Sequence, residues 1–276
     1  IITIGLPLFY LYKKRNSFAG KHLLFFGHSL LLILTISNLP SFAGFPLFPG
    51  ATFSFIPMCI MAYGVFNSDF RNLKDFFFEK NALFYILNVI AGVVLLSLTY
   101  VILFRFSPAH YETLNWPWLL IPVGSIFFVV ALAILIGGTN PTNPLNQYGA
   151  FSLYIFGFLL LSVIIGGLSL KPLMAHRIEQ LCYMVFGLAP SVQLRFAYLS
   201  LNRPAPKFRR VLDILSLALC IMAMTPWLFT GYFEYPWGRI SQAGPVIQVF
   251  GVVGFLAIAI VLRDWWKSRN RANPNR

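Results

Sequence analysis

The sequence has few charged residues for its length. Asp, Glu, Lys and Arg make up 11% of the 276 residues, and hydrophobic residues make up 58%, whereas a soluble domain has about 25% charged residues. This balance indicates an integral membrane protein. The connectors between the apolar runs average about ten residues, because each membrane span takes up roughly 20. A kinase, cyclase, nuclease or hydrolase domain is therefore excluded within these residues.

Acidic residues, histidines and cysteines, which supply most catalytic and metal sites, are also scarce. The eight acids are scattered, with no Asp-x-x-Asp or His-x-x-x-x-Asp pattern. His22 and His28 are six residues apart, a spacing that does not bring two rings onto one face of a helix. Cys59, Cys182 and Cys220 lie in apolar runs without a CxxC motif, and we interpret them as small core residues. We predict no catalytic residue, no metal site and no cofactor.

Apolar runs dominate the chain and predict an all-α integral membrane protein, a polytopic helical bundle of about nine transmembrane helices. The runs are 1–12, 22–42, 46–66, 82–104, 118–137, 149–170, 181–201, 211–230 and 243–263. The run at 1–12 begins at Ile1 and is too short to cross a bilayer. We therefore expect the natural chain to have more sequence upstream. The alternative is eight complete spans with 1–12 as a fragment.

Basic residues outnumber acidic ones by 21 to 8, and their distribution predicts an orientation. When connectors are assigned alternately to the two sides, one set carries 16 Lys and Arg residues and the other set carries four. The first set is 13–21, 67–81, 138–148, 202–210 and 263–276, and the second is 43–50, 105–117, 171–180 and 231–242. By the positive-inside rule the first set and the C-terminus are cytoplasmic. Nucleic acid is not an expected partner, because the basic residues form no continuous stripe.

An offset of 187 residues aligns two parts of the chain and predicts an internal repeat. The aligned pairs include Ser29-Leu30 with Ser216-Leu217, Gly44 with Gly231, Pro49 with Pro236, and Gly64-Val65 with Gly251-Val252. An even number of helices separates the two copies, so the repeat is parallel and both hairpin loops, 43–50 and 231–242, face outside. We expect two related helical membrane regions, 1–137 and 138–276, the second with a basic C-terminal tail. Chance similarity between aromatic-rich spans is the alternative.

The first hairpin loop carries a family resemblance. Its sequence includes Pro49-Gly50-Ala51-Thr52-Phe53-Ser54-Phe55-Ile56-Pro57 and Ala62-Tyr63-Gly64-Val65. This stretch resembles a recurring hairpin in the seven-helix N-terminal membrane sensor region of bacterial histidine kinases and related cyclase and phosphatase receptors. The segments 148–153 and 187–198 are similar to the opening of that region and to its third helix. The resemblance implies a bacterial cell membrane, a sensory role and an attached output domain.

The second hairpin loop contains a candidate ligand site of a different composition. It reads Trp237-Gly238-Arg239-Ile240-Ser241-Gln242 where the first copy has the resembling core, so no ligand contact is carried over from the family. Glu234 and Arg239 share this loop with Tyr235 and Trp237, and Trp227 lies just before it. Charged groups beside aromatic ones suit a small amphiphilic ligand in a shallow pocket. The alternative is an aromatic belt at headgroup level, which explains most of the Trp residues.

Two charged residues lie within predicted spans. Arg195 is six residues before the cytoplasmic end of 181–201, and Asp213 is just inside the start of 211–230. We interpret both as structural, with Arg195 reaching the headgroups and Asp213 capping its helix. The alternative is an Arg195–Asp213 pair that locks two adjacent helices.

These observations favour a non-catalytic membrane sensory domain of a bacterial signalling protein, which binds a ligand or a partner. Its expected partners are membrane lipids, a small amphiphilic ligand, and an output domain, a partner protein or a second copy. One alternative is a transporter with parallel repeats, for which Pro57 and Gly244-Pro245 would be helix breaks. Another is a structural subunit of a membrane complex. A lipid-linked transferase would need clustered carboxylates or histidines, which the sequence lacks.

Overall fold

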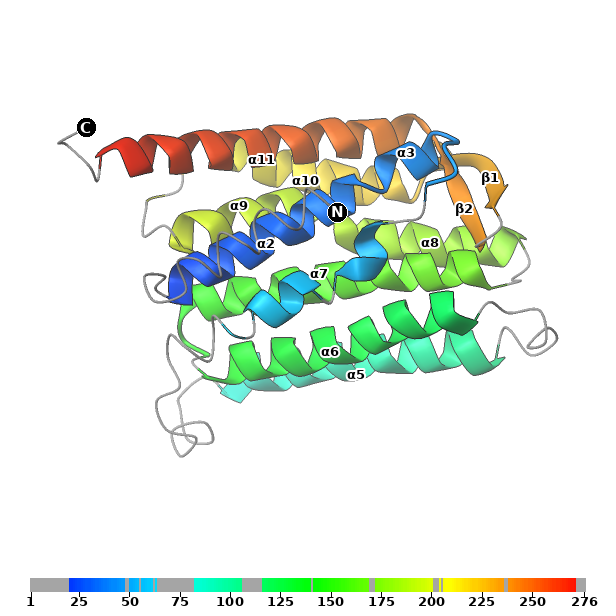
Figure 1. Ribbon diagram of the computed structural model, residues 1–276, viewed down its shortest axis with the longest axis horizontal. Coiled ribbons are helices and arrows are strands. Elements are labelled where there is room, and N and C mark those ends of the chain that lie inside the picture. The colour runs from blue at the N-terminus through cyan, green and yellow to red at the C-terminus, as the bar shows by residue number, and fades with distance from the viewer. Residues whose placement is uncertain are drawn as a thin grey trace.

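The computed structural model is an elongated helical bundle whose helices run along its long axis (Figure 1). It describes residues 20–47, 50–54, 56–61, 63, 82–105, 116–139, 141–168, 172–200, 204, 206–235 and 238–271. The helices are α2 (Gly20–Ile36), α3 (Leu39–Phe42), α5 (Ala82–Arg105), α6 (Trp116–Thr139), α7 (Pro144–Gly167), α8 (Pro172–Phe186), α9 (Ala189–Ser200), α10 (Arg209–Ala223) and α11 (Pro245–Arg271). A short 3-10 helix, η1 (Gly50–Phe53), and two strands, β1 (Phe229–Tyr235) and β2 (Gly238–Ala243), complete the labelled elements.

Four of the described helices are long and apolar enough to cross a membrane. The segments are Leu83–Phe104, Leu119–Gly138, Pro144–Gly166 and Pro245–Asp264. Each has at least the 20 residues that a bilayer requires. The described part of the chain is thus mostly helical and of membrane type. The total of about nine spans, the parallel repeat and the division into 1–137 and 138–276 stay predictions. The run 1–12 lies outside the described residues.

α7 lies at the centre of the bundle. Its most apolar stretch is 78% buried, compared with 28% for those of α5 and α11. Leu153, Phe156, Leu160 and Ile164 are buried at spacings of three and four residues, which place them on one helical face. α7 packs against α5, α6, α8 and α9. Helices from both predicted regions therefore share one hydrophobic core.

Three predicted spans are divided in the structure. The run 181–201 is split between α8 and α9 by a turn at Gly187-Leu188, and Pro190 occupies the first turn of α9, where a proline is tolerated. The run 22–42 is split between α2 and α3 at residues 37–38. The run 211–230 is helical only to Ala223, because Pro226 disfavours helical backbone in the residue before it.

The chain beyond α10 forms a β-hairpin, which corrects the all-α prediction at this point. β1 and β2 are antiparallel, with Tyr232 opposite Ser241 and Glu234 opposite Arg239. A register shift between Phe229 and Gly231 leaves an extra residue on β1, the signature of a β-bulge. Aromatic and β-branched residues favour strand over helix in this segment. We call residues 229–243 the hairpin.

The two loops that the sequence places outside lie at the same end of the molecule and contact each other. The Oη atom of Tyr235 donates a hydrogen bond to the carbonyl oxygen of Ser41 at 3.1 Å. Gly44 has a φ of +95°, and a Cβ atom there would lie 3.2 Å from the ring of Phe233. A left-handed turn against an aromatic ring requires glycine at this position. Pro49, Pro236 and Gly64 of the repeat lie outside the described residues.

Candidate functional site

The predicted ligand residues of the hairpin are only partly brought together. Arg239 Nη2 lies 3.1 Å from Glu234 Oε1, but the Glu234 side chain is 78% exposed. Tyr235 is held by Ser41, as described above, and Trp227 is exposed before β1. Trp237 lies outside the described residues. The exposed Glu234–Arg239 pair is of a kind that contributes at most about 1 kcal/mol.

A second acid lies beneath this exposed pair. Glu179 on α8 is 4% exposed and accepts a hydrogen bond from Ser241 Oγ of β2. Burial raises the pKa of Glu179 from its ordinary 4.5 to about 8, against the opposing effects of the Ser241 hydrogen bond and the Arg239 charge. The neutral carboxyl is therefore favoured where the hairpin meets α8. The sequence placed Glu179 in an outer connector and gave no sign of its burial.

Further contacts hold the hairpin and its approach against α7 and α8. Gln180 Nε2 donates to the carbonyl oxygen of Thr225 at 3.0 Å, and Arg177 donates to Gln180 at 3.1 Å. A Cβ atom added to Gly166 would lie 2.2 Å from the carbonyl oxygen of Arg239, so only glycine allows this approach of helix and strand. The hairpin is thus packed against the helices of the bundle.

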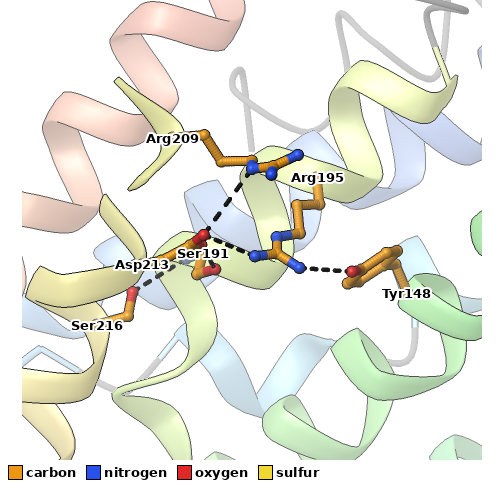
Figure 2. A network of polar contacts seen from close by, with 6 residues as sticks. All are labelled: Tyr148, Ser191, Arg195, Arg209, Asp213 and Ser216. Carbon is orange, nitrogen blue, oxygen red and sulfur yellow. Dashed lines mark hydrogen bonds and ion pairs between the residues drawn. The ribbon is translucent and has the colours of Figure 1, made fainter. Parts of the chain in front are cut away.

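A polar network lies toward the other end of the bundle and involves both charged residues that the sequence singled out (Figure 2). Arg195 of α9 donates from Nη2 to Asp213 Oδ2 of α10 at 2.7 Å and from Nη1 to Tyr148 Oη of α7 at 2.6 Å. Arg209 Nε lies 3.9 Å from the same Asp213 oxygen. The Arg195 and Asp213 side chains are 30% and 28% exposed. Arg195 therefore links three helices at a partly solvated position.

Asp213 does not cap its helix, which corrects one of the two structural interpretations. Phe208 is the N-cap residue of α10, and its side chain makes no capping hydrogen bond. Asp213 instead accepts a hydrogen bond from Ser191 Oγ of α9. The backbone N of Ser191 donates to Ser216 Oγ at 3.2 Å (Figure 2). The first turn of α9, whose N–H groups lack partners within the helix, is thus held by α10.

α9 is also tied to α11 at this end of the molecule. Tyr198 Oη donates a hydrogen bond to Asp264 Oδ2. Ser191, Arg195 and Tyr198 are spaced by four and three residues, and such spacing places side chains near one another on a helix surface. One short helix therefore has polar contacts with α7, α10 and α11.

An apolar cavity of about 110 Å³ lies between α2 and α3, the α8–α9 pair and α11. Its wall includes Phe42, Tyr183, Phe186 and Phe250. Gln193 of α9 also lines it and is 5% exposed. The Gln193 Nε2 atom donates to Ser152 Oγ of α7 at 3.0 Å, but Oε1 has no hydrogen-bond partner in the described structure. We call this cavity the slot.

No family model, curated protein or solved structure matches the chain. The resemblance to bacterial sensor regions therefore stays a prediction. Among the described residues, no three His, Cys, Asp or Glu side chains are grouped as a metal site would require. The sequence reasoning missed Gln193 and the Glu179–Ser241 contact, because neither belongs to a motif.

Proposed function

We propose that the chain is a non-catalytic, multi-pass sensory region of a bacterial signalling protein, with the hairpin outside the cell and the C-terminal end of α11 in the cytoplasm. A ligand or partner at the hairpin shifts the population of helix arrangements. α11 passes this change to an output domain or partner protein.

The observation that carries this proposal is the buried attachment of the hairpin to α8. Ser241 is 1% exposed and Glu179 is 4% exposed, so a shift of β2 separates two groups that have no access to water. A buried polar group that loses its partner costs about 1–3 kcal/mol. The hairpin cannot move without disturbing α8, which continues through the turn at 187–188 into α9.

The far end of α9 provides the second half of the route. Arg195 and Tyr198 connect α9 to α10 and α11 near the ends of those helices that lie opposite the hairpin (Figure 1). A displacement of α9 therefore reaches the helix to which an output domain would be joined. Allostery of this kind requires two distinct sites and an element that has two arrangements.

The two prolines named for the transporter alternative lie at helix starts. Pro245 begins α11 directly after the hairpin, and Pro57 lies in the first turn of the helical segment 56–61. Neither proline breaks a continuous helix, and prolines at helix starts are ordinary.

The proposal is tested by measuring distances between spin labels at exposed Lys207 and exposed Arg263 in bilayer nanodiscs. Exposed Cys59 and half-buried Cys220 are first replaced by Ser. Ser241→Ala, which removes the hydrogen bond to Glu179, stands in for a disturbance at the hairpin. We expect it to shift or broaden the distance distribution, whereas the control Thr230→Ala, an exposed change on β1, leaves it unchanged. Identical distributions in the parent and Ser241→Ala would reject the proposed route.

A further inference from the structure

The slot runs along α11. The residues of α11 that line it include Ile247, Gly251, Gly254, Ile258 and Val261, a stripe with steps of three and four residues. From the first to the last, this stripe is roughly 21 Å long at 1.5 Å per residue. The hydrocarbon core of a bilayer is about 30 Å thick. The slot therefore follows a candidate membrane span through much of its depth.

The slot has free space along one of its walls and opens at its rim. A Cβ atom added at Gly254 would meet no atom within 4 Å, and one at Gly251 would meet only the Leu39 methyl groups, at 3.7 and 3.8 Å. Phe255 lines the slot and is nevertheless 64% exposed. An exposed aromatic residue of a membrane span faces lipid, so the opening at Phe255 connects the slot with the bilayer and not with water.

Two residues that line the slot each carry a buried polar atom without a hydrogen-bond partner in the described structure, Tyr183 Oη and Gln193 Oε1. Gln193 is 95% buried, since its exposed fraction is 5%, and its Nε2 group is already used by Ser152. Gln193 Oε1 remains an unpaired acceptor. Buried acceptors of this kind are rare in native proteins, and each calls for a water, a ligand or another explanation. A donor that enters the slot with an apolar chain would satisfy this acceptor and fill the free space.

We propose that the slot binds a single-chain lipid that carries one hydrogen-bond donor, a long-chain alcohol in chemical class. It enters from the bilayer past Phe255, its hydroxyl donates to Gln193 Oε1, and its chain lies along α11 toward Phe42. The stripe along α11, roughly 21 Å long, has room for a chain of the length of dodecanol. This site is separate from the hairpin, and the inference holds whether or not the chain is a sensor.

The test uses two photoreactive probes on the full chain in phosphatidylcholine nanodiscs. One is dodecanol with a diazirine in the middle of its chain, and the other is its methyl ether, which has no donor. Labelled peptides are quantified by mass spectrometry. Labelling of the lipid-facing helix α5 reports the amount of each probe in the bilayer and serves as the internal reference. We expect the alcohol to label α9 and α11 about tenfold more than the ether. The hydroxyl of the alcohol pairs with the buried acceptor, whereas the ether leaves it unpaired at a cost of about 1–3 kcal/mol.

Two variants separate this site from nonspecific lipid contact. Gln193→Leu should bring the alcohol-to-ether ratio on α9 and α11 close to one, because the acceptor is gone. Gly254→Leu should abolish the excess of alcohol labelling, because it fills the slot without a backbone clash. Gly124→Leu is the control and should not change the labelling, because among the described glycines Gly124 also has nothing within 4 Å of an added Cβ atom and lies on the exposed surface of α6. Equal labelling of the parent by the two probes would overturn the inference and assign Gln193 Oε1 to a bound water. If Gly254→Leu shows the same excess of alcohol labelling as the parent, the inference is overturned, even if Gln193→Leu fails to fold.

Discussion

Glu179 and Glu234 lie at the same end of the molecule and differ in their environment. The Glu234 side chain is 78% exposed and pairs with Arg239 in solvent. Glu179 is enclosed between α8 and β2, and burial raises its pKa to about 8. Burial disfavours the charged form of a carboxyl group unless opposite charge and hydrogen bonds compensate fully. At Glu179 the compensation by Ser241 and Arg239 is incomplete.

The raised pKa of Glu179 predicts a pH dependence of folding stability. The folded state holds the Glu179 proton more tightly than the unfolded state, whose pKa is near 4.5. The stabilising contribution is therefore fully present below the unfolded pKa and is lost as the pH rises through about 8. Thermal unfolding in detergent between about pH 5 and about pH 9 should show a falling midpoint in the parent.

Glu179→Gln keeps the shape of the side chain and cannot ionise. We expect the fall in its unfolding midpoint over the same pH range to be much smaller than in the parent. Glu234→Gln, at the exposed acid on the neighbouring hairpin, is the matched control and should keep the pH profile of the parent. A profile of Glu179→Gln that matches the parent would show that Glu179 is not the titrating group.

At the scale of elements, α9 is a short helix held by polar contacts on several sides. Arg195 contacts both α7 and α10, and because its side chain and that of Asp213 are nearly a third exposed, solvent screens their attraction. A double-mutant cycle with Arg195→Ala and Asp213→Asn, measured by denaturant unfolding, should give a coupling of about 1 kcal/mol. Both single variants should still assemble, and Arg210→Ala, at an exposed neighbour, should not couple to Asp213→Asn.

The size of that coupling distinguishes between the interpretations of the pair. A coupling near zero would mean that Arg195 and Asp213 act independently at the interface. A coupling of about 3–5 kcal/mol would instead be typical of a buried pair that loses one partner. The second outcome would contradict the partly exposed geometry described above.

The contact between α7 and β2 gives a further prediction at this scale. Gly166→Ala places a methyl group against the Arg239 carbonyl, and overpacking of this kind typically costs about 1–3 kcal/mol. We expect faster hydrogen exchange of the amides in β1 and β2, measured by mass spectrometry. Gly124→Ala, where the added atom meets nothing within 4 Å, should exchange as the parent does. Unchanged exchange in Gly166→Ala would mean that α7 does not hold the hairpin in place.

The elements that the sequence predicted well are those that local signals determine. α5, α6, α7 and α11 follow long apolar runs. α7 begins at Pro144, five residues before the predicted run 149–170, because the Asn143 side chain caps it by accepting from the Leu145 backbone N at 2.9 Å. The divided runs have equally local causes at Pro190 and Pro226, which hydropathy alone does not weigh. The burial of Glu179 and Gln193 depends on contacts between elements distant in sequence, and no pattern in a single sequence reports such contacts.

At the scale of the whole molecule, the connectors alternate between two ends. One side of the bundle, where the C-terminus is marked, holds the first residues of α7 and α10 and the last residues of α6, α9 and α11 (Figure 1). The hairpin lies on the opposite side (Figure 1). The distribution of Lys and Arg predicts the same alternation from the sequence. Which end faces the cytoplasm remains a prediction of the positive-inside rule.

The account depends on the hairpin and the cytoplasmic ends of the helices lying on opposite sides of the membrane. Single cysteines at exposed Glu234 and exposed Lys207, in a chain without Cys59 and Cys220, test this in intact cells with a membrane-impermeant maleimide. Glu234→Cys should be labelled from outside, and Lys207→Cys only after the membrane is opened. Labelling of Lys207→Cys in intact cells, or protection of Glu234→Cys, would contradict the orientation and with it the proposal of an external signal.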